Sequence, residues 1–154
     1  MSQYDELVAE RQECLWSFFR ARTREGLKTL LEAFMEHERD VFLACEPFQR
    51  SERRRGYRNG FQIRWLDTPL GPVRLRKPRV RDAEGTFQSQ VIARYQRRAP
   101  RIERAVREWI ACGASTRDVV RLARTCFRIE FSAGAVSTIV ARLDRTIARF
   151  HTRP

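Results

Sequence analysis

Histidine, lysine and closely spaced cysteine are scarce in this sequence of 154 residues. It has two histidines, and its four cysteines (Cys14, Cys45, Cys112 and Cys126) lie far apart, with no CxxC pair. A zinc site needs ligands at short spacing, so we expect no metal ion and no cofactor in this chain. Isolated thiols of this kind are typical of core residues in a reducing cytoplasm.

Long apolar runs are also missing. No stretch approaches the ~20 apolar residues of a membrane helix, and no apolar block follows the N-terminus as in a signal peptide. Export and membrane spanning are therefore excluded as first interpretations, and we expect a cytoplasmic protein. Hydrophobic residues make up 42% of the chain, which is enough to bury the core of one ordinary domain or two very small ones.

The abundant residue is arginine. Lysine and arginine together number 31 against 19 acidic residues, a net charge of +12, and Lys28 and Lys77 are the only lysines. Residues 1–50 carry a net charge of −3, residues 51–100 of +9 and residues 101–154 of +6. Arginine forks bind phosphate groups bidentately and also contact guanine edges, so the charge predicts a polyanionic partner for the part of the chain after residue 50.

The pattern predicts a mostly α fold with three regions: an N-terminal helical pair in residues 1–47, a basic linker with a small β-hairpin in 48–99, and a three-helix helix-turn-helix bundle in 100–154. The first helix of the pair runs from residue 2 to about 23, and Gly26 allows a break. The second ends before Pro47. Both helices are amphipathic, so residues 1–45 either pack within the chain or form a homodimer.

The hairpin is predicted from two alternating runs, residues 61–66 and 73–77, around a turn at 68–71. We expect Phe61, Trp65, Val73 and Leu75 on a buried apolar face. Arg64, Arg74 and Arg76 then belong to the opposite, cationic face.

Three helical patterns follow residue 100. Ser115 and Asp118 form a capping box before the second of these helices, and Ser132 caps the last one. The expected core consists of Ile102, Ala105, Val106, Trp109, Ile110, Val119, Leu122, Ala123, Cys126, Val136, Ile139, Val140, Leu143 and Ile147.

This outline is that of a helix-turn-helix unit, whose last helix enters the DNA major groove. The residues expected to contact base edges are Ala133, Gly134, Ser137, Thr138 and Arg142. The residues expected to contact the DNA backbone are Arg53, Arg54, Arg55, Arg58, Asn59, Arg64, Arg74, Arg76, Lys77, Arg79, Arg81, Arg97, Arg98, Ser115, Thr116, Arg117, Arg121 and Arg124. Many small helical bundles share this outline without binding DNA, and the positive charge favours the DNA-binding interpretation.

Several motifs occur in a familiar order: GYRNG (56–60), PRVRD (78–82), RYQRR (94–98), GASTRDVV (113–120) and FSAGAVSTIVARLD (131–144). With them, roughly residues 28–154 resemble the N-terminal half of Mutator-type bacterial insertion-sequence transposases. The resemblance implies a nucleoid-associated protein that binds double-stranded DNA at transposon terminal inverted repeats. It also implies that an RNase H-like catalytic domain, with three carboxylates holding divalent metal, follows Pro154.

No catalytic residue is carried over from the family, because Arg153-Pro154 corresponds to the segment just before its first catalytic aspartate. The remaining aspartates, Asp67, Asp82, Asp118 and Asp144, are expected on turns, caps and helix surfaces, so this chain alone is not expected to cut DNA. One departure concerns Arg128, where family members commonly have glycine. An arginine there must adopt the left-handed conformation at a cost or force another turn.

Two alternatives to a DNA-binding module stay open. The chain is either a fragment of a longer enzyme, or a stand-alone module that dimerises and competes with the intact transposase. RNA binding is a weaker alternative, because the aromatic residues that a stacking surface needs, Phe61, Trp65 and Trp109, are expected to be buried.

Overall fold

The computed structural model describes residues 3–49, 51–83 and 85–151, with side chains from residue 7 to residue 142. The chain forms two compact units. The first contains the residues up to Trp65 together with Arg74–Tyr95, and the second contains Leu66–Val73 together with the residues from Gln96 onward. The β-hairpin thus contributes its long arms to the first unit and its tip to the second.

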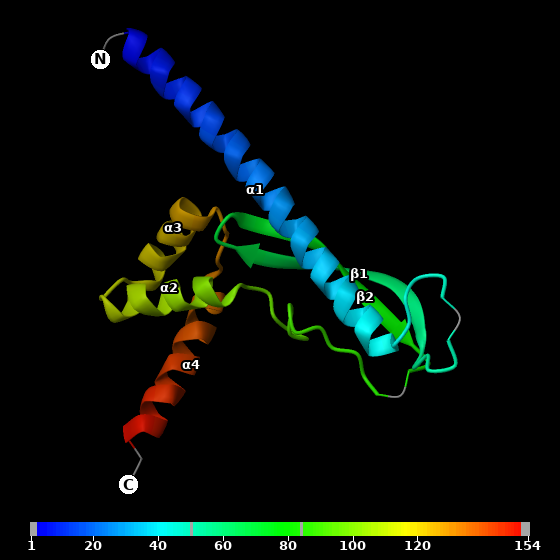
Figure 1. The fold of residues 1–154 in the computed structure, drawn as a ribbon. Helices are drawn as coiled ribbons and strands as arrows, with labels where there is room; N and C mark the ends of the chain where they lie inside the picture. Colours follow the sequence, from blue (N-terminus) through cyan, green and yellow to red (C-terminus); the bar gives the residue numbers. More distant parts are fainter. Residues whose placement is uncertain (1–2, 50, 84, 152–154) are drawn as a thin grey trace. The chain divides into compact units, whose positions relative to one another are not determined.

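The first unit begins with one long helix, α1 (Gln3–Leu43), which has 41 residues (Figure 1). The expectation of a helical pair broken at Gly26 is therefore wrong. A glycine in a helix interior costs only about 1 kcal/mol relative to alanine. The flanking residues are mostly strong helix formers, and no proline occurs before Pro47, so the helix propagates through the glycine.

The hairpin consists of β1 (Tyr57–Thr68) and β2 (Gly71–Arg81), which pair as a two-stranded sheet. Only Pro69 and Leu70 separate the strands. The Thr68 hydroxyl donates a hydrogen bond to the Gly71 carbonyl (2.7 Å) and accepts one from the Leu70 N–H (3.2 Å). The predicted hairpin and its turn are confirmed, with longer strands than expected.

The residues on the buried and exposed faces of this hairpin differ from those expected. The buried residues at its tip are Leu66 and Thr68 on β1 and Val73 and Leu75 on β2. Phe61, Ile63 and Trp65 alternate with them and are exposed, together with Arg74 and Arg76. A two-residue loop places Thr68 opposite Gly71 and hence Trp65 opposite Arg74, so the expected pairing of Trp65 with Val73 on one apolar face is wrong.

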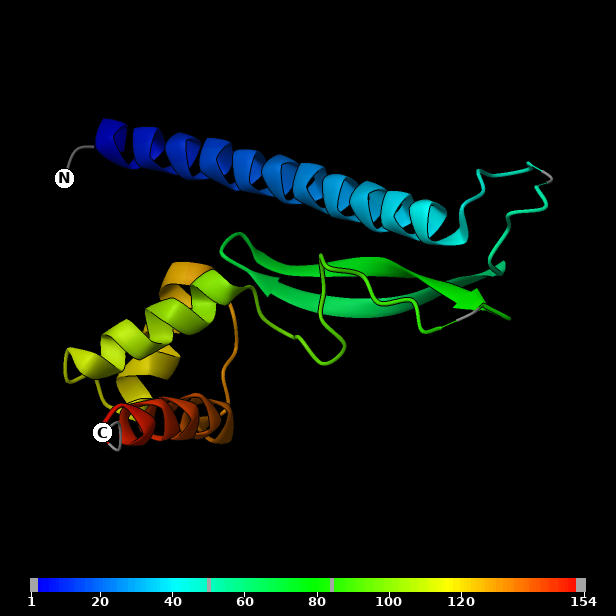
Figure 2. The same cartoon turned by 60° about the horizontal axis from the view of Figure 1, so that its bottom comes forward.

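The C-terminal half of α1 lies along the hairpin (Figures 1 and 2). Met35 and Leu43 are buried there, and Phe42 packs on Phe87 with ring centroids 5.4 Å apart. The Glu38 carboxylate accepts hydrogen bonds from the Ser89 hydroxyl and from the Gln90 N–H. These contacts join the helix to the segment after β2.

The second unit contains a three-helix bundle of α2 (Pro100–Ala111), α3 (Thr116–Phe127) and α4 (Ala133–His151) (Figure 2). Its helices pack around a shared core, as expected at most positions. The buried residues are Ile102, Val106, Val119, Ala123, Val136 and Ile139, which were expected, and Ile129 and Phe131, which were not. The other expected residues Ala105, Trp109, Ile110, Leu122 and Val140 are half-buried. Of the four cysteines only Cys45 is buried, so the expectation that Cys14, Cys112 and Cys126 are core residues is wrong. The side chains of Leu143 and Ile147 lie outside the described residues.

Both predicted caps of the bundle are present. Ser115 and Asp118 form the capping box of α3, and the Ser132 hydroxyl accepts a hydrogen bond from the Ala135 N–H at the start of α4 (3.2 Å). Arg128 closes α3 in the left-handed conformation, with φ 53° and ψ 39°. Its N–H bonds the Arg124 carbonyl (3.0 Å), as a glycine at this position would.

A first prediction tests which face of the hairpin each side chain occupies. Leu75→Ala removes a fully buried side chain and is expected to lower the free energy of unfolding by about 2–5 kcal/mol. Trp65→Ala removes a larger side chain that is 59% exposed, and we expect a loss below about 1 kcal/mol. Chemical denaturation followed by circular dichroism measures both, and equal losses would contradict the assignment of faces.

A second prediction concerns the strain at Arg128. The left-handed conformation costs a residue with a Cβ about 1 kcal/mol. Arg128→Gly is therefore expected to stabilise the bundle by about that amount in thermal unfolding. Arg128→Ala is the matched control, because it removes the same exposed side chain but keeps the Cβ. A gain for alanine as large as that for glycine would show that the arginine side chain, not the backbone, is responsible.

Candidate nucleic-acid interface

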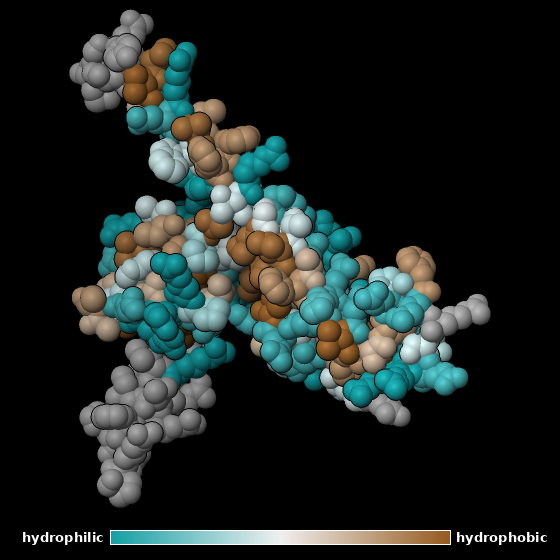
Figure 3. Space-filling model, in the orientation of Figure 1, coloured by the Kyte–Doolittle hydropathy of each residue, from teal (hydrophilic) through white to brown (hydrophobic). Residues whose placement is uncertain are grey.

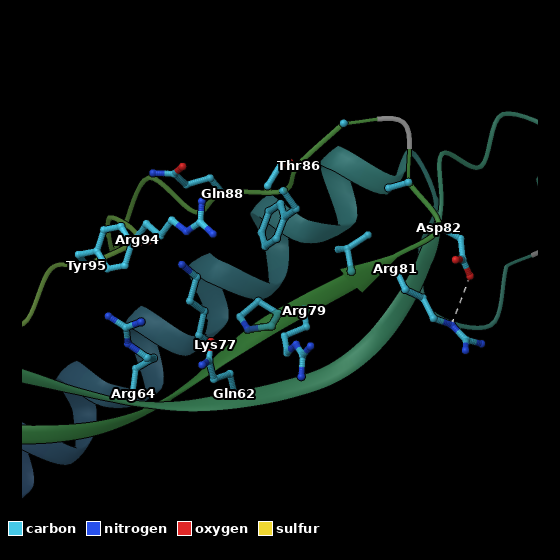
Figure 4. A pocket seen from close by; sticks show the side chains of 15 residues that line it. Gln62, Arg64, Lys77, Arg79, Arg81, Asp82, Thr86, Gln88, Arg94 and Tyr95 are labelled. Atoms are coloured by element: carbon cyan, nitrogen blue, oxygen red, sulfur yellow. Dashed lines mark ion pairs between the residues drawn. The ribbon is translucent and has the colours of Figure 1, made fainter.

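A cationic groove of about 640 Å³ lies in the first unit, between the hairpin and the segment that follows β2 (Figure 4). Arg64 enters it from β1, Lys77, Arg79 and Arg81 from β2, and Arg94 from the later segment. The first four of these were expected to contact the DNA backbone. The structure brings them together around one hollow, which is suited to an anionic chain.

The charge inside the groove is reflected in the titration of Lys77. Burial lowers the pKa of the Lys77 ammonium, and the positive charges of Arg64 and Arg94 lower it further, although Glu38 acts in the opposite direction. The Lys77 Nζ lies 3.5 Å from the Ile92 carbonyl oxygen. A phosphate oxygen placed among these cations would relieve their mutual repulsion.

Two residues of this groove were missed by sequence reasoning, Arg94 and Tyr95. The Arg94 guanidinium lies 5.6 Å from the centroid of the Tyr95 ring, which is 81% exposed. Both belong to the RYQRR motif, of which only the last two residues, Arg97 and Arg98, were expected to contact DNA. The motif itself, a tyrosine among arginines, was the available signal.

The expectation that Phe61 and Trp65 are buried is also wrong. Both are exposed on the hairpin, as is Tyr57. The guanidinium of Arg76 lies 5.0 Å from the Phe61 ring centroid, and that of Arg54 lies 4.5 Å from the Tyr57 ring centroid. Trp109 is half-buried and stacks on Phe127 in the bundle. The hairpin therefore does present exposed aromatic rings of the kind on which bases stack.

Arg58, which was expected to contact DNA, is bound within the protein. Its guanidinium donates to Asp40 at 2.8 and 3.2 Å and to the carbonyls of Cys45 and Glu46. Burial raises the pKa of Asp40, but hydrogen bonds and positive charge from Arg39 and Arg58 outweigh this, and the net pKa lies below its usual value. This arginine fixes the end of α1 to the start of β1.

Three further candidates have internal partners. Arg54 donates to the Gly56 carbonyl (2.9 Å), and Arg76 pairs with Glu32 (3.2 Å). In the second unit, Arg98 lies 3.7 Å from the Asp67 carboxylate and 4.4 Å from the Phe131 ring centroid. Burial raises the pKa of Asp67, and the charge of Arg98 partly offsets this.

The other candidates lie at the surface. In the first unit, the exposed side chains outside the groove are Arg53, Arg55, Asn59 and Arg74. In the second, Arg97, Thr116 and Arg117 are exposed.

At the start of α3, the capping box occupies polar groups that were expected to hold a phosphate. The Ser115 N–H and hydroxyl both donate to the Asp118 carboxylate, at 3.2 and 2.7 Å. These hydrogen bonds lower the pKa of Asp118, which keeps a negative charge at this helix end. Arg121 pairs with Asp118 and Arg124 with Glu130, each at 2.8 Å, but both arginines are well exposed.

The first turns of α4 present small side chains. Ala133, Gly134, Ser137 and Thr138 are exposed, and a Cβ at Gly134 would have no neighbour within 4 Å. The two hydroxyls donate to helix carbonyls one turn back, at 3.1 and 2.9 Å. Arg142 is exposed and lies 3.7 Å from Glu103 of α2. This helix end can approach another surface closely.

No group of three histidine, cysteine, aspartate or glutamate side chains is placed to hold a metal ion in the part of the chain that the structure describes. Within the same residues, no helix has the length and apolar character needed to cross a membrane.

Comparison with known proteins identifies the protein family to which this chain belongs. The family model described as "Transposase, Mutator family" matches residues 5–154. This chain therefore belongs to the Mutator family of transposases.

Individual relatives agree with the family. The chain is 33% identical over 130 residues to the transposase for insertion sequence element ISRM5 of Rhizobium meliloti, covering 84% of this chain and 32% of the relative. It is 29% identical over 127 residues to the transposase for IS256 in transposon Tn4001 of Staphylococcus aureus, covering 82% and 32%. With the IS905 transposase of Lactococcus lactis it shares 29% identity over 147 residues, covering 95% and 36%. The chain thus spans about a third of the length of these relatives.

A third prediction separates structural from exposed arginines. Arg58→Gln breaks the pair with Asp40 and is expected to lower the free energy of unfolding by about 1–3 kcal/mol. Arg79→Gln, at an exposed position, is the control and is expected to change it by less than about 0.5 kcal/mol.

The same pair predicts a pH dependence. Because the folded pKa of Asp40 is depressed, its stabilisation is fully present above the usual value of 3.8 and is lost as the pH falls through the folded pKa. The stability difference between wild type and Arg58→Gln should therefore shrink in that acidic range. A constant difference down to acid unfolding would contradict the ion pair.

Proposed function

We propose that this chain binds duplex DNA at the terminal inverted repeats of an insertion sequence, as the N-terminal part of a transposase. The observation that carries the proposal is the groove, where five cationic side chains from three segments surround one hollow. Membership of a transposase family provides a biological reason for a polyanionic partner. In this proposal, the groove contacts phosphates and supplies affinity with little sequence preference.

Sequence preference is assigned to the bundle. We infer that α3 and α4 act as a helix-turn-helix, with the first turns of α4 in the major groove. The small residues Ala133 and Gly134 permit close approach, while Ser137 and Thr138 offer hydroxyls to base edges after exchanging their bonds to helix carbonyls. The exposed arginines of α3, Arg117, Arg121 and Arg124, contact the flanking backbone.

Strand transfer is assigned to residues outside this chain. The described aspartates support this: Asp67 lies near Arg98, Asp82 near Arg81, and Asp118 caps α3. Asp144 has a side chain outside the described residues. Three convergent carboxylates, as two-metal chemistry needs, are thus expected in another part of the transposase, together with its divalent metal.

A second candidate function is regulatory. A chain that binds the transposon ends and associates with itself, without strand transfer, would compete with the intact transposase. The exposed apolar side chains of α1 favour self-association. This function and the first one share DNA binding and differ in whether the chain works joined to a catalytic domain.

The fourth prediction tests DNA binding. A duplex selected by the protein from a random duplex library is compared with an unrelated duplex and a single strand of the same length, by fluorescence anisotropy. A protein contacting six to ten phosphates loses about 10³–10⁵-fold in affinity between 50 and 200 mM salt. We expect a loss in this range and preference for the selected duplex; a flat salt response, or stronger binding of the single strand, would overturn the proposal.

Matched variants assign the two surfaces. Arg79→Gln is expected to reduce the salt slope by about 1, whereas Arg58→Gln should leave the slope unchanged. Gly134→Gln and Gly134→Glu place side chains of equal size in open space, and glutamate suits a helix N-terminus. We expect the glutamine to reduce preference for the selected duplex, and the glutamate to weaken binding at least tenfold more. If both position-134 variants bind like wild type, α4 is not in the groove.

A further inference from the structure

The N-terminal half of α1 is an unpartnered helix within the first unit. From residue 7 to residue 26 every side chain is exposed or only half-buried, and the exposed ones include Leu7, Leu15, Trp16, Phe18 and Phe19. Figure 3 shows the hydrophobic side chains along this segment. The rings of Phe18 and Phe19 contact each other, and Arg22 lies over Phe18 at 5.6 Å. So much exposed apolar surface on one helix marks an interaction site.

The apolar side chains form a stripe. At 3.6 residues per turn, Leu7, Val8, Cys14, Leu15, Phe18 and Phe19 fall on one side of the helix, and their midpoint lies between residues 13 and 14. Arg11 and Arg22 fall within the same arc, and Arg22 lies over the Phe18 ring. The opposite side carries mainly polar and charged residues, together with Ala9 and the exposed Trp16. This stripe is separate from the surface that packs on the hairpin, which begins near Leu31 and Glu32.

The charges of the same segment are segregated along its axis. Residues 3–13 contain four acidic residues and one arginine, a net charge of −3. Residues 14–24 contain three arginines and no acidic residue, a net charge of +3. The change of sign coincides with the midpoint of the apolar stripe. A second copy in antiparallel orientation would place each acidic half beside a basic half, whereas a parallel copy would place like charges together.

We propose that two copies of this chain associate through an antiparallel pairing of the N-terminal halves of α1, centred near Cys14. Each copy presents the same stripe and the same charge pattern, so the contact is isologous and closes as a two-fold dimer. The half-exposed leucine and aromatic side chains of the stripe expose about 500 Å² of apolar surface to solvent in each copy. Two copies would remove about 1,000 Å², which reaches the lower limit of a specific interface.

Charge distinguishes this partner from a membrane. A helix that lies on anionic lipid carries basic residues along its polar face, whereas half of this segment is net negative. Antiparallel pairing with a second copy places opposite charge beside both the acidic and the basic half. The inference concerns α1 alone and does not rest on DNA binding.

The fifth prediction tests the dimer in the absence of DNA. Sedimentation equilibrium of the 154-residue chain is expected to give a mass that rises from one copy to two with concentration. Leu15→Glu, in the stripe, should raise the dimer dissociation constant at least about tenfold. Leu30→Glu is the matched control, because this leucine is similarly exposed on α1 (60% against 54%) but lies outside the stripe. A monomer at all concentrations up to ~100 μM, or equal effects of both variants, would overturn the proposal.

Two further variants test the charges. Glu10→Lys with Glu13→Lys makes both halves basic, and Arg20→Glu with Arg24→Glu makes both halves acidic. Each double variant is expected to dimerise at least about tenfold more weakly than wild type, and a 1:1 mixture of the two should form a heterodimer. If neither double variant is weakened, charge complementarity does not operate.

Orientation is tested by cross-linking. In a background with Cys14, Cys112 and Cys126 replaced by serine, Leu7→Cys and Ala21→Cys are made as separate proteins of different mass. Antiparallel pairing about residue 14 brings position 7 of one copy near position 21 of the other. Mild oxidation should therefore yield the mixed dimer, while Leu7→Cys alone should stay uncross-linked. Efficient cross-linking of Leu7→Cys to itself would indicate a parallel pair and overturn the proposal.

Discussion

The two-residue turn at Pro69 and Leu70 determines what each hairpin side chain does. The Thr68 hydroxyl bonds to both sides of this turn and is itself buried. Side chains in a strand alternate between faces, so a shift of one residue would exchange the two faces completely. The observed pairing buries Leu66, Val73 and Leu75 and places Arg64 and Lys77 in the cationic groove. It also leaves Phe61, Ile63 and Trp65 outside.

Acidic residues of α1 form ion pairs with some of the arginines of the hairpin. Glu32 and Asp40 face the hairpin and bind Arg76 and Arg58. These arginines therefore stabilise the contact between helix and hairpin. The cations that line the groove lie on β1, further along β2 and in the segment after it. Burial lowers the pKa of Lys77 there, and the positive charges of Arg64 and Arg94 lower it further. The negative charge of the first third of the sequence thus balances one set of arginines and leaves another as a cationic surface.

The sequence predicted the elements better than their faces. Ser115, Asp118 and Ser132 mark helix starts by local hydrogen bonds, and the bundle helices were therefore found. The length of α1 was not, because the cost of Gly26 depends on the stability of the helix around it. The alternation of Phe61, Ile63 and Trp65 was mistaken for a core face, since periodicity does not say which side of a strand is covered. Likewise, no local pattern tells that Arg58 meets Asp40, eighteen positions earlier.

The continuity of α1 through Gly26 links the two proposals. The C-terminal half of the helix is fixed to the hairpin by ion pairs and by packing at Met35 and Leu43, so the direction of its N-terminal half is fixed as well. With a rise of 1.5 Å per residue, the proposed pairing centre near Cys14 lies about 30 Å from the hairpin contact at Met35. A two-fold pair would then hold two hairpins about 60 Å apart along the paired helices. If the chain binds terminal inverted repeats as proposed, the repeats are related by the same two-fold symmetry, and such a dimer would offer one cationic groove to each of them.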